Sequence, residues 1–235
     1  MTLTAALLDA TRPTPLITFY DDATGERIEL SGVTTANWAA KTANLLRDEC
    51  DVEPHVPIAV LLPAHWQTAA VLLGAWWCGA VVVSDPSAAD WVFCDRERVN
   101  LALRAEHAMG VLALSLDAFG RGLPDLPPGV IDFATEVRGH GDEFLVEQPV
   151  PDDAPALDAA TIADVLTEAR HRAAALGIGS GDRVLSTREW DTRAGLIDGL
   201  LAILAAGASL VQVRNADPAA LDRHANAERV TVRLT

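Results

Sequence analysis

The sequence has 235 residues, of which half are hydrophobic and 22% are charged. This length and composition are typical of a globular chain with a substantial buried core, and they exclude an intrinsically disordered protein. The 33 Asp and Glu residues against 18 Lys and Arg residues give a formal net charge of −15. Such a field repels phosphate backbones and anionic membrane surfaces, so we expect neither nucleic acid nor a membrane as a partner.

The cysteines and the apolar segments indicate the compartment. Cys50, Cys78 and Cys94 lack CxxC spacing and have apolar neighbours, which is typical of reduced structural thiols. The N-terminal residues lack the basic region and long apolar run of a signal peptide. The longest apolar run, Ala69–Val83, is too short to cross a bilayer. We therefore expect a soluble, cytoplasmic protein.

The first quarter of the chain predicts helices on either side of a β-hairpin. A short helix is expected at Thr4–Ala10, followed by strands at Leu16–Tyr20 and Arg27–Leu30 around a turn rich in Asp and Gly. A long helix is then expected from Thr34 or Thr35, either of which can cap it, to about residue 49.

The segment Pro57–Pro86 predicts a strand, a helix and a second strand. Pro57–Leu62 is a short apolar run, and His65–Cys78 carries apolar residues at helical spacing. Gly79 stands where a helix would end, and the β-branched run Ala80–Val83 follows at once. A helix that ends on glycine and leads into a valine run is typical of a βαβ crossover in a parallel sheet.

Further strands and helices alternate along the rest of the chain. Strands are expected at Trp91–Cys94, Val111–Ser115, Val130–Phe133, Arg183–Ser186, Ala208–Val213 and Arg229–Leu234, and helices at Glu97–Ala108, Ala159–Leu176, Arg193–Ala206 and Pro218–Ala225. Frequent Gly and Pro over residues 116–150 indicate loops and an internal boundary. We expect an α/β fold with two βαβ-type lobes and mostly parallel sheets, residues 1–148 and 149–235, within one compact domain.

The βαβ pattern occurs twice. Leu72 and Leu73 precede Gly79 and its valine run at the same spacing as Leu200 and Leu201 precede Gly207 and residues 208–211. A repeated strand–helix–glycine–strand unit indicates two similar lobes, although chance similarity between two generic crossovers would give the same pattern.

Four segments in order resemble a known family. They are LLGAWWCGAVVVSDP at Leu72–Pro86, GDRVLS at Gly181–Ser186, EWDTRAGLIDGLLAILAAGASLV at Glu189–Val211 and the final ERVTVRLT. Together they resemble the first half of the N-terminal domain of the adenylate-forming superfamily, which includes acyl-CoA synthetases, peptide-synthetase adenylation domains and luciferases. The whole chain is similar to short, degenerate stand-alone members found in actinobacteria.

The departures from that family indicate lost catalysis. The family holds ATP phosphates on a Ser/Thr/Gly-rich loop ending in Pro-Lys-Gly, but here Ala156 and Leu157 run directly into Asp158 and a predicted helix. No lysine follows Lys41, and the family's adenine and ribose motifs and C-terminal domain are not present. We therefore expect a non-catalytic homologue without a cofactor, acting as a binding or protein-interaction module.

Two alternatives remain. One is a small-molecule binding protein for an acyl, amino-acid or nucleotide ligand at the carboxyl ends of the strands, where α/β sheets usually bind. The residues expected to line that site are Ser84, Asp85, Thr187, Trp190 and Asp191. The other is one part of a split adenylate-forming enzyme.

In amino-acid-activating relatives the residue matching Asp191 pairs with the substrate ammonium group, but here we favour a helix cap near Arg193.

Other features bear on partners and metals. Trp77 is expected to pack in the core, while Trp76, about 100° away around the helix, can face the other lobe or another chain. The last strand, Arg229–Leu234, is a candidate sheet edge, and covering it would give a homodimer. The six histidines lack the spacing of metal ligands, so no metal site is expected.

Overall fold

The computed structural model describes all 235 residues, which form two compact units. The first unit comprises Met1–Ala5, Asn37–Leu62 and Ala70–Val165, and the second comprises Ala6–Ala36, Pro63–Ala69 and Leu166–Thr235. The units are therefore not the contiguous segments 1–148 and 149–235 expected from the sequence. The difference arises because the N-terminal hairpin pairs with a strand near the C-terminus, which the sequence pattern does not reveal.

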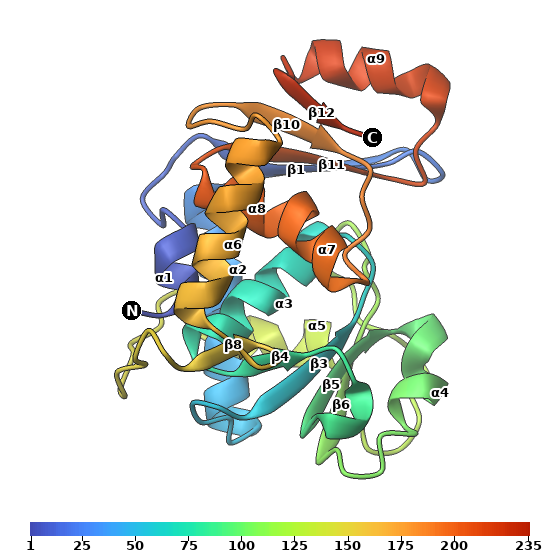
Figure 1. Ribbon diagram of the computed structural model, residues 1–235. Helices are drawn as coiled ribbons and strands as arrows, with labels where there is room; N and C mark the ends of the chain where they lie inside the picture. The colour runs from blue at the N-terminus through green and yellow to red at the C-terminus, as the bar shows by residue number, and fades with distance from the viewer. The chain divides into compact units, whose positions relative to one another are not determined.

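The first unit is built on a seven-stranded sheet with the order β7-β6-β5-β3-β4-β8-β9 (Figure 1). Its strands are β3 (Pro57–Leu61), β4 (Val81–Val83), β5 (Trp91–Asp95), β6 (Gly110–Leu114), β7 (Val130–Asp132), β8 (Pro155–Leu157) and β9 (Ala160–Thr161). All neighbouring strands pair in parallel except the β8–β9 hairpin. Every residue of β5 is buried, as expected for a strand in the middle of a parallel sheet.

The helices vary widely in length. They are α1 (Leu3–Leu7), α2 (Gly32–Glu49), α3 (Trp66–Trp77), α4 (Val99–Ala102), α5 (Phe133–Glu136) and α6 (Ile162–Ala175), with 3-10 turns at Pro86–Ala88, Arg96–Arg98 and Val137–Gly139. The helix predicted at Glu97–Ala108 is reduced to α4. Leu101 and Leu103 are exposed there, so few buried contacts are available to hold a longer helix.

The second unit is built on a five-stranded sheet with the order β12-β10-β11-β1-β2. Its strands are β1 (Pro15–Asp21), β2 (Glu26–Ser31), β10 (Arg183–Ser186), β11 (Ser209–Arg214) and β12 (Val232–Leu234), and its later helices are α7 (Arg193–Leu196), α8 (Ala202–Ala205) and α9 (Pro218–Ala227). A π-helical segment, Ile197–Leu201, joins α7 to α8. The expected hairpin β1–β2 and the expected edge strand β12 are both confirmed.

Both predicted βαβ crossovers are present. β3 and β4 are parallel and joined through α3, and β10 and β11 are parallel and joined through α7 and α8. Gly79 and Gly207, with φ of 84° and 73°, end the two helices in the left-handed conformation that glycine adopts without a side-chain penalty. The sequence repeat therefore corresponds to a repeated backbone motif. The α/β fold with mostly parallel sheets is as expected.

The two adjacent tryptophans take the opposite roles to those expected. Trp76 is only 2% exposed, and its Nε1–H donates a hydrogen bond to the Ala156 carbonyl at 2.8 Å. Trp77 is partly exposed, and its ring centroid lies 6.1 Å from that of Phe144. The expectation was wrong because β8, next to β4 in the sheet, supplies a carbonyl partner that makes burial of the Trp76 indole favourable.

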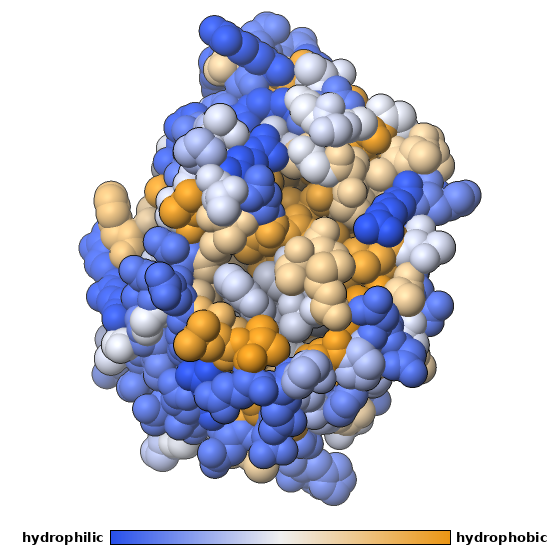
Figure 2. All heavy atoms as spheres, turned by 90° about the vertical axis from the view of Figure 1, so that its left-hand side faces the viewer, coloured by the Kyte–Doolittle hydropathy of each residue, from blue (hydrophilic) through white to orange (hydrophobic).

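Hydrophilic residues cover much of the face drawn in Figure 2, with apolar residues gathered between them. None of the helices combines the length and apolarity that a bilayer span requires. Cys50, Cys78 and Cys94 are buried free thiols, and burial raises the pKa of each to about 12.

Candidate functional site

Ser84 and Asp85 lie at the carboxyl end of β4, as predicted. The Ser84 backbone N–H and hydroxyl donate hydrogen bonds to the Asp158 carboxylate at 2.7 Å and 2.9 Å. Asp85 accepts hydrogen bonds from the Ser87 N–H and hydroxyl at 2.9 Å and 2.8 Å, so it caps the following 3-10 turn. These bonds hold the pKa of Asp85 below its usual value. Both predicted residues are thus engaged in local structure.

Asp158 lies in the turn of the β8–β9 hairpin, where the family resemblance places the phosphate loop. Leu157 pairs with Ala160, so only Asp158 and Ala159 connect the two strands. Asp158 has φ of 51°, a left-handed conformation that aspartate tolerates. Its backbone N–H donates to the Val82 carbonyl at 2.8 Å and is not available to an anion. The sequence predicted that the loop is missing but took residues 159–161 for the start of a helix.

The carboxylate of Asp158 gives this turn a negative charge. A phosphate loop stabilises its ligand with several free backbone N–H groups and a lysine. Here the N–H groups of Asp158 and Ser84 are both taken, the second of them by a carboxylate. Because like charges repel, the Asp158 carboxylate opposes the approach of an anion to this turn.

Thr187, Trp190 and Asp191 follow the carboxyl end of β10 in the second unit. The Thr187 N–H donates to the Leu234 carbonyl at 3.2 Å and so extends the pairing of β10 with β12. Trp190 is 7% exposed, and a Cβ added to Gly199 of the π-helical segment would lie 2.7 Å from its Nε1. Trp190 therefore packs edge-on against the π-helical backbone, at a position where any larger residue would clash.

Asp191 is not the helix cap. The cap of α7 is Thr192, whose hydroxyl accepts the Gly195 N–H at 3.1 Å. Asp191 is exposed and forms no hydrogen bond. The prediction was wrong by one residue, because a helix that begins at Arg193 takes its cap from the position immediately before. The Asp191 carboxylate is accordingly free at the surface of this loop.

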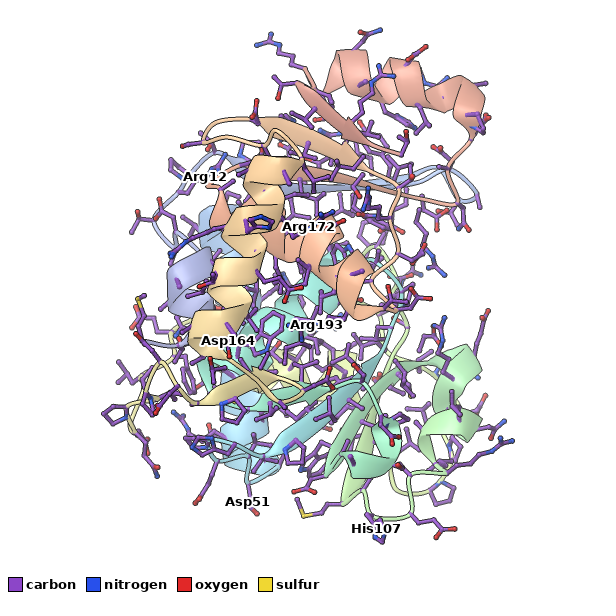
Figure 3. All side chains as sticks on the ribbon, in the orientation of Figure 1. Arg12, Asp51, His107, Asp164, Arg172 and Arg193 are labelled. Carbon is purple, nitrogen blue, oxygen red and sulfur yellow. The ribbon has the colours of Figure 1, made fainter.

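Sequence reasoning missed a buried carboxylate next to this loop. Asp198 lies in the π-helical segment with its side chain 7% exposed, and it accepts hydrogen bonds from Arg172 at 2.8 Å and 2.9 Å and from Arg188 at 2.6 Å. The hydrogen bond from Arg172 is the main cause that keeps the pKa of Asp198 below its usual value. Figure 3 shows Arg172 on α6. The sequence feature that could have predicted this buried ion pair is an aspartate inside the apolar run Gly195–Leu204. An acidic residue in such a run is expected to be buried, and buried carboxylates are rarely left unpaired.

Two buried polar atoms near this loop have no hydrogen-bond partner. They are Nε1 of Trp190 and Oε1 of Gln212, whose residues are 7% and 1% exposed. The other end of the Gln212 amide donates to the Arg188 carbonyl at 3.1 Å, which fixes the side chain beside the loop. Unsatisfied buried polar atoms are uncommon, and they are found at strained or ligand-binding positions.

The predicted site residues therefore fall into two groups. Ser84 and Asp85 form one group in the first unit, and Thr187, Trp190 and Asp191 form the other in the second unit. Neither unit contains a cluster of three or more His, Cys, Asp or Glu residues arranged to hold a metal ion.

No family model matches the chain. It is 52% identical to a TIGR03089 family protein of Mycobacterium tuberculosis over 238 residues, which cover 98% of this chain and 97% of that protein. Among solved structures, an acyl-CoA synthetase of Brucella canis matches with a TM-score of 0.82 and 17% identity, covering 99% of this chain and 47% of that one. The N-terminal domain of FACL13 from M. tuberculosis matches with a TM-score of 0.77 and 14% identity, covering 99% and 62%.

The structural matches establish the fold. At these identities the likeness extends to the α/β architecture alone, which is that of the N-terminal domain of acyl-CoA synthetases. This chain spans less than two thirds of the length of either solved structure.

Proposed function

Because the chain belongs to the TIGR03089 family and has the fold of an acyl-CoA synthetase N-terminal domain, we propose that it is a non-catalytic homologue of those enzymes. In this proposal it acts as a binding or protein-interaction module and transfers no adenylyl group. The α/β framework is retained, and the parts that would position and neutralise a nucleotide are replaced.

The observation that carries the proposal is the β8–β9 turn. Adenylyl transfer requires that the phosphates be positioned and that negative charge be stabilised in the transition state. The turn instead presents the Asp158 carboxylate, already hydrogen-bonded to Ser84. A negative group at this position opposes both requirements.

The only lysine of the chain does not compensate. The Lys41 ammonium group lies 2.8 Å from the Asp142 carboxylate and donates a hydrogen bond to the His140 carbonyl at 2.6 Å. Its charge is therefore used to fix the segment after α5 against α2. This supports the view that no lysine of this chain serves a phosphate.

Calorimetric titration with MgATP tests the proposal. We expect no saturable binding at millimolar nucleotide, and saturable binding would contradict the loss of the phosphate site. A catalytically competent acyl-CoA synthetase, titrated in parallel, confirms that the conditions permit binding. The variant Asp158→Asn removes the charge of the turn and should not create a site, because the backbone N–H groups stay occupied.

A second candidate function is a retained small-ligand site at the carboxyl end of β10. The unpartnered Nε1 of Trp190 and Oε1 of Gln212 favour it, since one can donate to and the other accept from an acid or amide group if the packing of Trp190 against Gly199 opens to admit a ligand. Thermal-shift screening with AMP, acyl-CoA and amino acids tests this function, because a ligand of the folded state raises the melting temperature. The shift should be lost in Trp190→Phe, which keeps an aromatic ring but lacks the N–H donor.

A further inference from the structure

The first unit contains a cavity of about 170 Å³ near the C-terminal ends of α2 and α3. Six of the residues that line it decide its chemistry, namely the aromatic residues Trp77 and Phe144, the cation Arg47 and the carboxylates of Asp51, Glu53 and Glu147. Figure 3 shows Asp51 just beyond the end of α2. A cavity of this size is smaller than the usual pocket for a drug-sized molecule, so it suits a ligand of only a few heavy atoms rather than a nucleotide or a coenzyme A.

The aromatic side chains form one part of the wall. The ring centroids of Trp77 and Phe144 lie 6.1 Å apart with an angle of 58° between the ring planes. Aromatic faces carry negative partial charge and attract cations within about 6 Å of the ring centre. The chain already uses this property, because the guanidinium carbon of Arg47 lies 5.0 Å from the Phe144 centroid.

The charge of Arg47 is largely neutralised within the protein. Its Nε donates to the Asp48 carboxylate at 2.7 Å, and a second nitrogen donates to the Asn44 side-chain oxygen at 3.0 Å. The hydrogen bond between the two side chains is the main cause that raises the pKa of Arg47 and lowers the pKa of Asp48, so it favours the charged form of both. Little of the guanidinium charge remains to attract an anion into the cavity.

Three further residues of the lining are acidic. Asp51 and Glu53 carry carboxylates that form no hydrogen bond or ion pair, while Glu147 lies 3.7 Å from Arg47. The C-terminal ends of α2 and α3 add partial negative charge, because the peptide dipoles of a helix align with their negative ends there. Both contributions favour a positively charged occupant.

We propose that this cavity binds a small organic cation, an amine or quaternary ammonium compound with apolar substituents. The apolar substituents contact Trp77 and Phe144, and the acidic rim formed by Asp51 and Glu53 stabilises the charge. The inference does not rest on the proposed function, because the cavity lies entirely within the first unit and involves neither group of predicted site residues. In this proposal the Trp77 ring forms part of the binding wall, which a ring buried in the core could not do.

Titration calorimetry with choline tests the proposal, with its uncharged isostere dimethylbutanol as the matched ligand. We expect choline to bind saturably and the isostere to bind about tenfold more weakly or less, since a desolvated cation–π contact and acidic neighbours act on the charge alone. Trp77→Leu should weaken choline binding about tenfold, and Asp51→Asn about threefold. Asparagine suits the latter position because residue 51 has φ of 49°.

The control variant is Glu106→Gln, which removes an exposed carboxylate that does not line the cavity and should leave choline binding unchanged. Circular dichroism of Trp77→Leu confirms that the variant is folded, and Asp51→Asn provides a second test that leaves the aromatic wall intact. Three results would overturn the proposal. They are equal binding of choline and dimethylbutanol, preference for an organic anion such as benzoate, and no saturable choline binding to the folded wild-type chain.

Discussion

The Asp158 carboxylate accepts hydrogen bonds from both the backbone N–H and the hydroxyl of Ser84, at 2.7 Å and 2.9 Å. This pair joins the carboxyl end of β4 to the turn of the β8–β9 hairpin. In the resemblance to adenylate-forming enzymes, the β8–β9 turn stands at the place of the loop that holds the phosphates. A carboxylate of the chain itself thus occupies the two hydrogen-bond donors of Ser84 beside this turn.

Removal of this pair should destabilise the hairpin measurably. Asp158→Ala loses two hydrogen bonds and places a residue with a Cβ but no polar group at φ of 51°, so we expect a loss of about 2–3 kcal/mol in the free energy of unfolding. Asp158→Asn keeps an acceptor and tolerates the conformation, and should lose about 1 kcal/mol. Urea denaturation measures both. Asp153→Asn, an exposed aspartate nearby in the sequence, is the control, and an equal loss in the control would contradict the account.

A buried carboxylate should make the second unit sensitive to acid. The side chain of Glu228 is 6% exposed and accepts hydrogen bonds from Tyr20 at 2.6 Å, from Arg27 at 2.9 Å and from Arg183. Burial alone would raise the pKa of Glu228, but the hydrogen bonds from Tyr20, Arg183 and Arg27 together outweigh it. Its pKa in the folded chain therefore lies below the ordinary 4.5.

The sign of the pH dependence follows from that direction. A carboxylate with a lowered pKa in the folded state contributes stability above pH 4.5, and the contribution is lost as the pH falls through the folded-state value. Glu228→Gln should cost about 3 kcal/mol at pH 7, because it leaves two arginines without their buried partner. The difference between variant and wild type should shrink below pH 4.5 in urea denaturation. A difference that stays constant down to pH 3 would show that Glu228 does not act through its charge.

The two adjacent tryptophans should respond unequally to the same substitution. Trp76→Leu removes a buried indole and leaves the Ala156 carbonyl unpaired, so we expect a loss of about 3 kcal/mol. Trp77→Leu should cost about 1 kcal/mol, because that ring is already partly in contact with water. Chemical denaturation of both variants measures the difference. A larger loss of stability in Trp77→Leu than in Trp76→Leu would contradict this account and would support the burial of Trp77 that helix periodicity alone suggested.

The two helix-ending glycines provide a comparison within the repeat. A Cβ at Gly207 would have no contact closer than 3.5 Å. Gly207→Ala should therefore lower the free energy of unfolding by about 1 kcal/mol, because of the φ of 73° alone. A Cβ at Gly79 would also lie 2.9 Å from Cγ2 of the buried Val150, so Gly79→Ala should cost about 1 kcal/mol more. Gly139→Ala is the control, since neither a clash nor a left-handed φ is present there. Thermal unfolding that ranks Gly207→Ala lowest in stability would contradict this reading.

Much of the fold could be predicted from local patterns. The strands of both crossovers, the N-terminal hairpin and the edge position of β12 follow from apolar runs bounded by glycine, proline and aspartate. The sequence could not reveal which strands pair across long distances. The pairing of β1 with β11 joins segments at opposite ends of the chain, and periodicity carries no information about such partners.

The candidate site was harder to predict, because its details depend on individual contacts. The direct run from Ala156 and Leu157 into Asp158 was visible in the sequence, but the antiparallel β8–β9 hairpin depends on pairing that short segments do not specify. The burial of Asp198 depends on Arg172 and Arg188, which lie on other elements. The π-helical segment likewise gives no periodic signal that separates it from an ordinary helix.

The most direct test of the central claim is the exchange of radiolabelled pyrophosphate into ATP, measured across a panel of fatty, aromatic and amino acids with the purified full chain. A catalytically competent acyl-CoA synthetase in the same assay is the positive control. The account predicts no exchange above the rate of a no-enzyme blank for any acid. Reproducible exchange that depends on one acid, that survives further purification and that scales with the concentration of this chain would contradict it.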